Sequence, residues 1–180
     1  MTGWRHLCET PEGNLRKGGK AGASIIILSD SHGDAGSVYR AVAAQPEAAA
    51  VLYLGDGAAD LAAAAAAFPR LAFYPVRGNG DFAPDAAGLP YAREECFGGK
   101  RFFLTHGHLY GVKTDPLRVV YAARERGADI LLYGHTHRPL TDYEDGLHIL
   151  NPGSLRAGGT YGVVDLSDAG VVLNIVRCRP

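Results

Sequence analysis

Short apolar segments alternate with polar or amphipathic segments from Ser24 onward. The apolar segments are rich in β-branched or aromatic residues and are bounded by Gly, Pro, Asp or Ser, a pattern that is typical of buried strands. They predict five strands, at residues 24–28, 51–54, 71–76, 101–105 and 129–133.

Helices are predicted between these strands, at residues 36–45, 58–68 and 115–126. The third is the best marked, because Asp115 can cap its first turn and Pro116 suits the first helical position. Gly127 suits the C-terminal cap. Alternation of strands and helices favours a mainly parallel sheet covered by helices.

Hairpins mark the rest of the chain. Two-residue Gly-Gly or Asp-Gly turns, and a similar Ser-Asp-Ala-Gly turn, separate pairs of strand-like segments. The three hairpins predicted in this way span residues 93–104, 140–150 and 161–176. They indicate a second, more antiparallel sheet packed on the first, so the fold class is α/β with two packed sheets flanked by helices.

Composition excludes several classes of protein. Hydrophobic residues make up 47% of the 180, which is enough for a packed core and argues against disorder. The formal net charge of −1 carries no basic excess, so electrostatic binding to nucleic acid or to an anionic membrane is not expected. No apolar run is long enough to cross a bilayer.

Residues 1–22 are polar and show no sustained periodicity, so we expect a flexible N-terminal extension before a single domain at 23–180. The three cysteines, Cys8, Cys96 and Cys178, lie far apart and match neither a disulfide framework nor a zinc pattern. Three reduced thiols and a cytoplasmic location are therefore expected.

Polar motifs follow all five predicted strands. They are DSH (30–32), GDG (55–57), GNG (78–80), HGH (106–108) and GHTH (134–137). The carboxyl ends of strands in an open α/β sheet are where ligands bind, and glycine allows the backbone a close approach. These motifs therefore predict one site assembled from five loops.

The residue types in these motifs indicate metal binding. Imidazoles, carboxylates and one amide suit Mn, Fe, Zn, Co or Ni better than Mg or Ca. The candidate ligands are Asp30, His32, Asp56, Asn79, His106, His135 and His137. Seven ligands exceed what one ion takes from a protein but can serve two ions that share a carboxylate, an arrangement used in phosphate-ester hydrolysis.

The ordered set of motifs resembles the calcineurin-like metallophosphoesterase superfamily. The resemblance covers residues 30–137, and NPGS at 151–154 resembles a further loop of the small bacterial and archaeal branch. Spacing is most similar to the YfcE-type phosphodiesterases. The resemblance implies a four-layer α/β/β/α sandwich and a phosphoesterase, most specifically a phosphodiesterase, that uses two divalent ions, with manganese the first expectation.

The resemblance also implies residue roles. One ion is held by Asp30, His32 and His137, and the other by Asn79, His106 and His135, with Asp56 bridging the pair. A hydroxide that bridges the two ions attacks phosphorus in line. Asn79 therefore counts among both the catalytic and the metal-binding residues.

One position departs from the family pattern. The residue after the GN asparagine is usually histidine or, in the small branch, often cysteine, whereas this chain has Gly80. Glycine can neither donate a proton nor contact phosphate through a side chain. His108 is the candidate for an acid or a phosphate contact, and activated or diester substrates are expected.

Several residues near the motifs allow two interpretations. Asp34 and Asp60 fit no motif and are expected in solvated loops or at helix starts. Asp81 either orients the Asn79 loop or shapes a turn. Arg77 faces substrate or forms a surface ion pair, and Ser154 is a weaker candidate for a phosphate contact.

Two alternative functions stay open at this point. The retromer complex contains a subunit of the same fold that acts in protein assembly, so a non-catalytic metal-binding scaffold is the first alternative. A single-metal hydrolase of amides or esters is the second. The expected partner is a small phosphate-ester substrate, and an exposed sheet edge allows a homo-oligomer.

Overall fold

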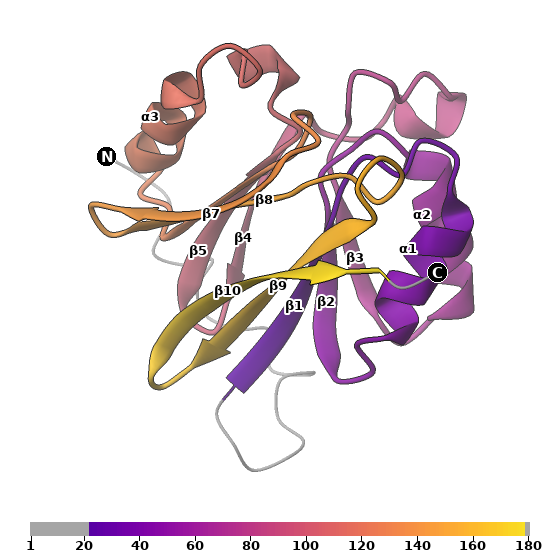
Figure 1. The fold of residues 1–180 in the computed structure, drawn as a ribbon, viewed down its shortest axis with the longest axis horizontal. Coiled ribbons are helices and arrows are strands. Elements are labelled where there is room, and N and C mark those ends of the chain that lie inside the picture. Colours follow the sequence, from indigo (N-terminus) through magenta and orange to yellow (C-terminus); the bar gives the residue numbers. More distant parts are fainter. Residues whose placement is uncertain (1–21, 179–180) are drawn as a thin grey trace.

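The computed structural model describes residues 22–178, with the side chain of Asp85 left aside. The predicted extension at 1–22 lies outside this range except for Gly22, which is the first residue of β1. Ten strands form two five-stranded sheets within the described range, and Figure 1 shows the helices on their outer faces. The predicted fold class, two packed sheets flanked by helices, is confirmed.

The first sheet has the strand order β10-β9-β1-β2-β3. Its parallel half comprises β1 (Gly22–Leu28), β2 (Ala48–Tyr53) and β3 (Ala72–Pro75). The antiparallel half is the hairpin of β9 (Thr160–Ser167) and β10 (Gly170–Arg177), which adds to β1. Helices α1 (Ala35–Ala43) and α2 (Ala58–Ala67) connect the parallel strands.

The second sheet has the order β4-β5-β6-β8-β7. Strands β5 (Lys100–Thr105), β6 (Ile130–Tyr133) and β8 (Leu147–Pro152) are parallel to one another. Strands β4 (Ala92–Phe97) and β7 (Pro139–Glu144) pair antiparallel at the two edges. Helix α3 (Leu117–Glu125) connects β5 to β6, and two short 3₁₀ helices lie at Pro84–Ala86 and His108–Tyr110.

This arrangement corrects one part of the sequence prediction. The five strands that end in polar motifs do not belong to a single sheet, because β1, β2 and β3 lie in the first and β5 and β6 in the second. Both sheets are mixed, so neither is the mainly parallel or mainly antiparallel sheet that was expected. All three predicted hairpins are present.

Alternating side chains on β1 separate the layers. Ile25 and Ile27 point toward the second sheet and pack with residues such as Phe102 and Leu132. Ile26, one residue along, points the other way and packs against the helices α1 and α2. A third cluster joins the second sheet to α3. The layers are therefore α/β/β/α, with the largest core between the sheets.

Helix α3 starts at Leu117, two residues later than predicted. The carboxylate of Asp115 nevertheless accepts a hydrogen bond from the Leu117 N–H at 2.9 Å, so its capping contact is present. Gly127 has a φ of 61°, the left-handed conformation that ends a helix most readily at glycine. The boundary differs because Pro116 stands before the helix rather than in its first turn.

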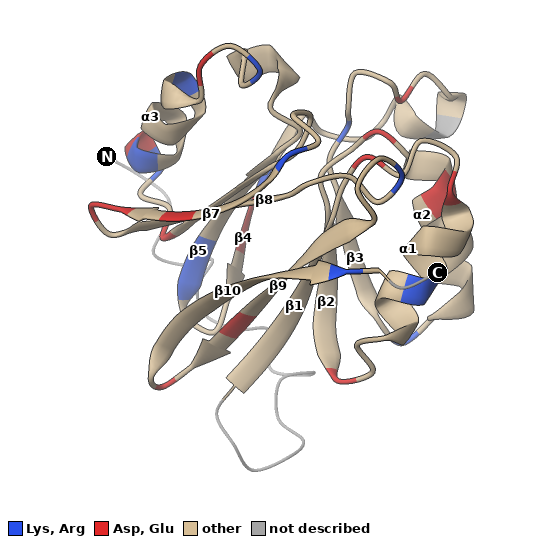
Figure 2. Ribbon diagram, in the orientation of Figure 1, with Lys and Arg blue, Asp and Glu red and all other residues tan. Residues whose placement is uncertain are grey.

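Charged residues are interspersed over the outer elements, with neither sign confined to one sheet or helix (Figure 2). None of the helices in the described range is long and apolar enough to span a membrane. Of the three cysteines, Cys8 lies outside the described residues, Cys178 is a free thiol and Cys96 is disulfide-bonded. The expectation of three reduced thiols is therefore wrong for Cys96, and a cytoplasmic location stays a prediction.

Candidate metal centre

The structure brings the candidate ligands together where strands of the two sheets end side by side. Six of the seven form two groups of three. Within each group, the ligand atoms all lie within 4.8 Å of one another. The first group is Asp30, His32 and His137, and the second is Asp56, His106 and His135. Asn79 joins the second group through its amide oxygen.

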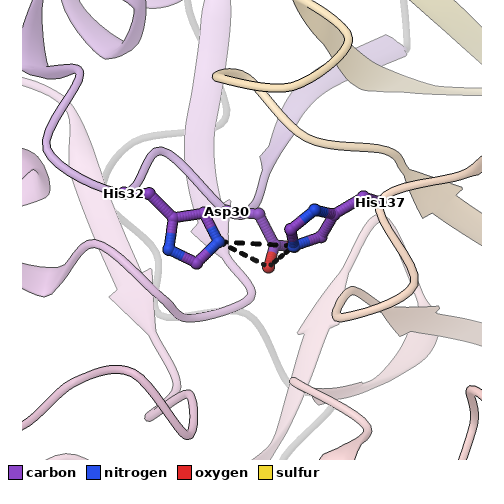
Figure 3. Close-up of side chains that lie close together, drawn as sticks. All are labelled: Asp30, His32 and His137. Atoms are coloured by element: carbon purple, nitrogen blue, oxygen red, sulfur yellow. Dashed lines mark hydrogen bonds and ion pairs between the residues drawn. The ribbon is translucent and has the colours of Figure 1, made fainter.

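The first group is compact, and its three side chains point toward one another (Figure 3). Oδ1 of Asp30 lies 3.0 Å from Nε2 of His137 and 3.6 Å from Nε2 of His32. The two Nε2 atoms are 3.3 Å apart. Asp30 is fully buried, whereas the side chains of His32 and His137 are about one-third exposed, so the group opens to solvent on the imidazole side.

The second group centres on His106. Its Nε2 lies 3.1 Å from Nδ1 of His135, 3.1 Å from Oδ1 of Asn79 and 3.4 Å from Oδ2 of Asp56. His106 is fully buried and Asp56 nearly so, while Asn79 is exposed. Four side chains from four loops thus point nitrogen or oxygen atoms at one small volume.

Asp56 links the two groups. The same oxygen that faces His106, Oδ2, also lies 4.0 Å from Nε2 of His32 in the first group. One carboxylate is therefore within reach of both groups, as the bridging assignment requires.

Backbone conformation marks the same residues. Within residues 22–178, six non-glycine residues have positive φ, and five of them are candidate ligands: Asp30, His32, Asp56, His135 and His137. The sixth, Asp145, lies in the β7–β8 turn, where this conformation is expected. Left-handed backbone is uncommon for non-glycine residues and concentrates at functional sites.

Gly78 shows why glycine is needed beside a ligand. A Cβ atom on Gly78 would lie 2.0 Å from Oδ1 of Asp56 and 2.4 Å from its backbone nitrogen. Any side chain there would displace the carboxylate that links the two groups.

Contacts behind the ligands fix their orientation. Nδ1 of His106 lies 2.7 Å from the carbonyl oxygen of Leu54, which places a proton on Nδ1 and directs Nε2 toward the second group. The other oxygen of Asp30, Oδ2, accepts hydrogen bonds from the Ser29 hydroxyl and, at 3.1 Å, from the His135 N–H. Asp30 therefore ties the two groups together through the backbone.

Asp81 is the strongest supporting residue, and the sequence left its role open. Its buried carboxylate accepts four backbone hydrogen bonds of 2.8–2.9 Å, from the N–H groups of Asp56, Gly57, Ala58 and Gly78. The Asp56 loop and the Asn79 loop are thus fastened to one carboxylate. Of the two predicted roles, orientation of the loop is the one that the structure shows.

Asp60 lies at a helix start, as expected, but it is not solvated. It is buried in the first turn of α2, and its Oδ2 accepts hydrogen bonds from the Ser31 hydroxyl at 2.5 Å and the Gly33 N–H at 2.8 Å. The buried Tyr53 hydroxyl lies 2.5 Å from the same Ser31 oxygen. This network holds the Asp30–His32 loop. Asp34, as expected, starts a helix by capping α1 through the Ser37 N–H.

The loop at 151–154 supports the site from the other sheet. The Asn151 amide donates to the Gly134 carbonyl and to the Thr136 hydroxyl, both at 3.0 Å, and so holds the GHTH loop. The buried Ser154 hydroxyl donates to the Asp30 carbonyl at 2.8 Å and accepts from the Ala157 N–H at 2.9 Å. Because these backbone partners occupy the hydroxyl, Ser154 positions Asp30 and is not placed to contact phosphate.

The pKa directions agree with a cluster of closely spaced ligands. Burial alone would raise the pKa of Asp56, but the His106 hydrogen bond and charge, with help from the Gly80 N–H and His32, lower it to about 2. Burial would lower the pKa of His106, but Asp56 and Asp30 raise it. Burial, followed by the charges of His106 and Lys113, lowers the pKa of His135 to about 4.

His108 lies beside the second group rather than in it. Its ring centroid is 5.3 Å from that of His106 and 6.1 Å from that of His135, and its edge meets Tyr91. Nδ1 of His108 is buried without a hydrogen-bond partner among the described residues. Burial and the charge of His106 lower its pKa, which favours the neutral imidazole.

Gly80 contributes its backbone to the site. Its N–H donates to Oδ1 of Asp56 at 2.6 Å, so the oxygen that does not face the histidines is fixed as well. A Cβ atom on Gly80 would lie 3.1–3.3 Å from the Asp56 carboxylate, which is tight but not excluded. The chain therefore offers an exposed glycine at this position.

The donor set fits two divalent ions of intermediate softness. Each group supplies imidazole nitrogens with a carboxylate oxygen, and the second adds an amide oxygen. The ligand atoms converge in the structure, and the buried His106 directs its Nδ1 to a carbonyl oxygen, as metal-binding histidines commonly do. The residues present therefore suit the metal centre that the motifs predicted.

Comparison with known proteins shows the family of this chain. Residues 24–169 match the Calcineurin-like phosphoesterase superfamily domain, and the chain belongs to that family. Over 137 residues it is 35% identical to probable metallophosphoesterase YsnB of Bacillus subtilis, covering 74% of this chain and 75% of that protein. It is also 35% identical over 100 residues to phosphodiesterase YfcE of Escherichia coli K12, covering half of each chain.

Solved structures show the same fold. A predicted phosphoesterase from Streptococcus pneumoniae aligns with a TM-score of 0.74 and 29% identity over 89% of this chain and 94% of that one. Vps29 from Entamoeba histolytica, solved in complex with Zn²⁺, aligns with a TM-score of 0.59 and 19% identity over 87% of this chain and 99% of that one. The second likeness concerns the fold alone.

Proposed function

We propose that this chain is a binuclear metal-dependent phosphodiesterase. The observation that carries the proposal is Asp56, whose single oxygen Oδ2 faces His32 of one ligand group and His106 of the other. Two ions held on either side of it would activate a water molecule for attack on phosphorus and neutralise charge on the phosphoryl oxygens. Manganese is the proposed metal, with Fe, Zn, Ni and Co as alternatives.

The residues of this chain have two kinds of role in the proposed site, holding the metal ions and positioning the ligands. Asp30, His32 and His137 hold the first position, and Asn79, His106 and His135 hold the second. The Leu54 carbonyl keeps His106 in the tautomer whose Nε2 lone pair is available. Asp81 holds the backbone on both sides of the second position, so that the ligands are placed before substrate arrives.

Protonation of the leaving group is where this chain departs from the pattern that its family resemblance implies. Gly80 has no side chain to protonate it, and His108 is mainly neutral because of burial and the neighbouring His106. A neutral imidazole donates a hydrogen bond through its N–H more readily than it delivers a proton. We therefore propose small diesters or activated esters as substrates, with the final proton supplied by water.

The second candidate function is a non-catalytic scaffold. Vps29 has the same fold, is named for vacuolar protein sorting rather than for an enzyme activity, and was solved with Zn²⁺. Metal binding alone therefore does not separate the two functions. The observation against the scaffold is the complete ligand set with its buried support, which a binding surface elsewhere on the protein does not require.

Hydrolysis of bis-p-nitrophenyl phosphate distinguishes the candidates. Purified protein loaded with Mn²⁺ should release p-nitrophenol between about pH 6 and 9, and Asp56→Asn should reduce the rate at least 100-fold because the shared carboxylate charge is lost. His148→Gln is the matched control, since His148 lies on β8 outside both groups. Absence of hydrolysis by fully loaded wild-type protein would favour the scaffold.

Asn79→Ala separates a two-ion site from a single-metal hydrolase. In the proposed site, the variant weakens the second position only, so the protein should retain one tightly bound ion and lose most diesterase activity. Wild-type protein that binds one ion per chain, with Asn79→Ala leaving that number unchanged, would favour the single-metal alternative.

A further inference from the structure

We infer that Arg156 binds the phosphate group of the substrate, an inference that rests on the proposed function. Arg156 follows the Asn-Pro-Gly-Ser loop and belongs to none of the five ligand motifs. Its residue is exposed, yet its side chain is anchored, because Nη1 donates to the carbonyl oxygen of His32. The guanidinium is thus fastened to the main chain of a residue whose side chain faces the metal position.

The backbone before Arg156 is equally tied to the site. The Arg156 N–H contacts the Asp30 carbonyl at 3.4 Å, and the Leu155 N–H donates to the Ser29 carbonyl at 3.2 Å. The buried Ser154 hydroxyl donates to the same Asp30 carbonyl. Leu155 is buried, so the chain emerges at Arg156 from a fixed support beside the first ligand group.

The pKa of Asp34 is lowered mainly by its hydrogen bonds from Ser37, and to a smaller extent by the charges of Arg40 and Arg156. Arg156 nevertheless forms no ion pair with an acidic side chain in the part of the chain that the structure describes. The arginine ion pairs found there involve Arg93, Arg101, Arg124 and Arg126 instead. The carboxylate of Asp34, on the neighbouring loop, is already occupied by the N–H and hydroxyl of Ser37.

The remaining donors suit a phosphate. A guanidinium has five N–H donors in a planar fork, and the His32 carbonyl occupies one of them in the contacts found here. The others can bind two phosphoryl oxygens at once, which a lysine ammonium cannot do with the same geometry. Arg156 would orient the ester on the first metal position and add positive charge at the mouth of the site.

Binding of inorganic phosphate to the Mn²⁺-loaded protein tests this inference without depending on catalysis. Isothermal titration calorimetry should give a phosphate Kd that is about tenfold or more weaker in Arg156→Ala than in wild type. Arg156→Lys should lie between the two. Arg70→Ala is the matched control, because Arg70 is exposed before β3, at the opposite end of the sheet from the ligands, and should leave the Kd unchanged.

Manganese content, measured on the same samples, distinguishes a role of Arg156 in phosphate binding from a role in holding the metal ligand His32. It should be equal in wild type and Arg156→Ala. A variant that loses manganese, a phosphate Kd that does not change, or wild-type protein that binds no phosphate would each overturn the inference. If phosphate binding weakens as expected but no ester is hydrolysed, the proposed function fails and the Arg156 assignment stands.

Discussion

The buried carboxylate of Asp81 accepts the backbone N–H of Asp56 at 2.9 Å, across 25 residues of sequence. Three further N–H groups, from Gly57, Ala58 and Gly78, converge on the same carboxylate. The residue that would bridge two metal ions is thus positioned by the carboxylate of Asp81.

Asp81→Asn should destabilise the protein and weaken metal binding together. An amide has one acceptor oxygen and turns a donor NH₂ toward N–H groups that already need acceptors, so we expect a loss of about 2–4 kcal/mol in the free energy of unfolding. Urea unfolding of the metal-free protein measures the first effect, and Mn²⁺ titration the second. Asp168→Asn, in the exposed β9–β10 turn, is the control. Unchanged unfolding of Asp81→Asn would refute the positioning role.

Gly78→Ala should disrupt the site although it adds a single methyl group. Its Cβ would overlap Oδ1 and the backbone nitrogen of Asp56, so the carboxylate must move. We expect a loss of about 3 kcal/mol, seen as a fall of about 6–12 °C in Tm, and at least a tenfold loss in Mn²⁺ affinity. Gly88→Ala is matched, since its Cβ would meet nothing within 4 Å, and its Tm should stay within about 3 °C of wild type. Equal Tm values for the two variants would contradict the crowding argument.

Mn²⁺ affinity should rise with pH through the neutral range. The pKa of His106 is raised because Asp56 and Asp30 outweigh burial. In metal-free protein this ligand therefore keeps a proton to higher pH than an ordinary histidine does, and metal must displace that proton. The pKa of His135 is about 4, so His135 is already neutral and adds no dependence above about pH 5. Calorimetric titration with Mn²⁺ in buffers of different ionisation enthalpy measures the protons released on binding. Near pH 6.5, about one proton should be released for each ion that binds at the second position. A Mn²⁺ affinity that does not change between about pH 6 and 8 would contradict this prediction.

The sequence predicted which residues converge in the structure, because each candidate ligand is marked by a local pattern. Each candidate ligand follows a short apolar strand and has glycine nearby, and the structure places every one of these loops at the shared end of the two sheets. The division of the five strands between two sheets could not be predicted. A strand's periodicity reports which faces are buried but not which neighbour it pairs with.

The supporting residues were harder to foresee because their partners are distant in sequence. Asp81 in GNGD resembles any aspartate in a turn, and three of its four donors come from residues 56–58. Asp60 resembles a solvated residue in an alanine-rich helix, but Ser31 and Gly33 bury it with hydrogen bonds from another loop. Only the folded chain reveals these contacts.

The most direct test of a binuclear hydrolytic centre is the rate of bis-p-nitrophenyl phosphate hydrolysis measured against the number of Mn²⁺ ions bound per chain. Metal-free protein should be titrated stepwise, with bound metal quantified at each step. If Asp56 joins two positions into one centre, the rate should stay low up to about one ion per chain and reach its maximum at about two. A maximal rate with a single ion bound, or no hydrolysis with two, would contradict the account.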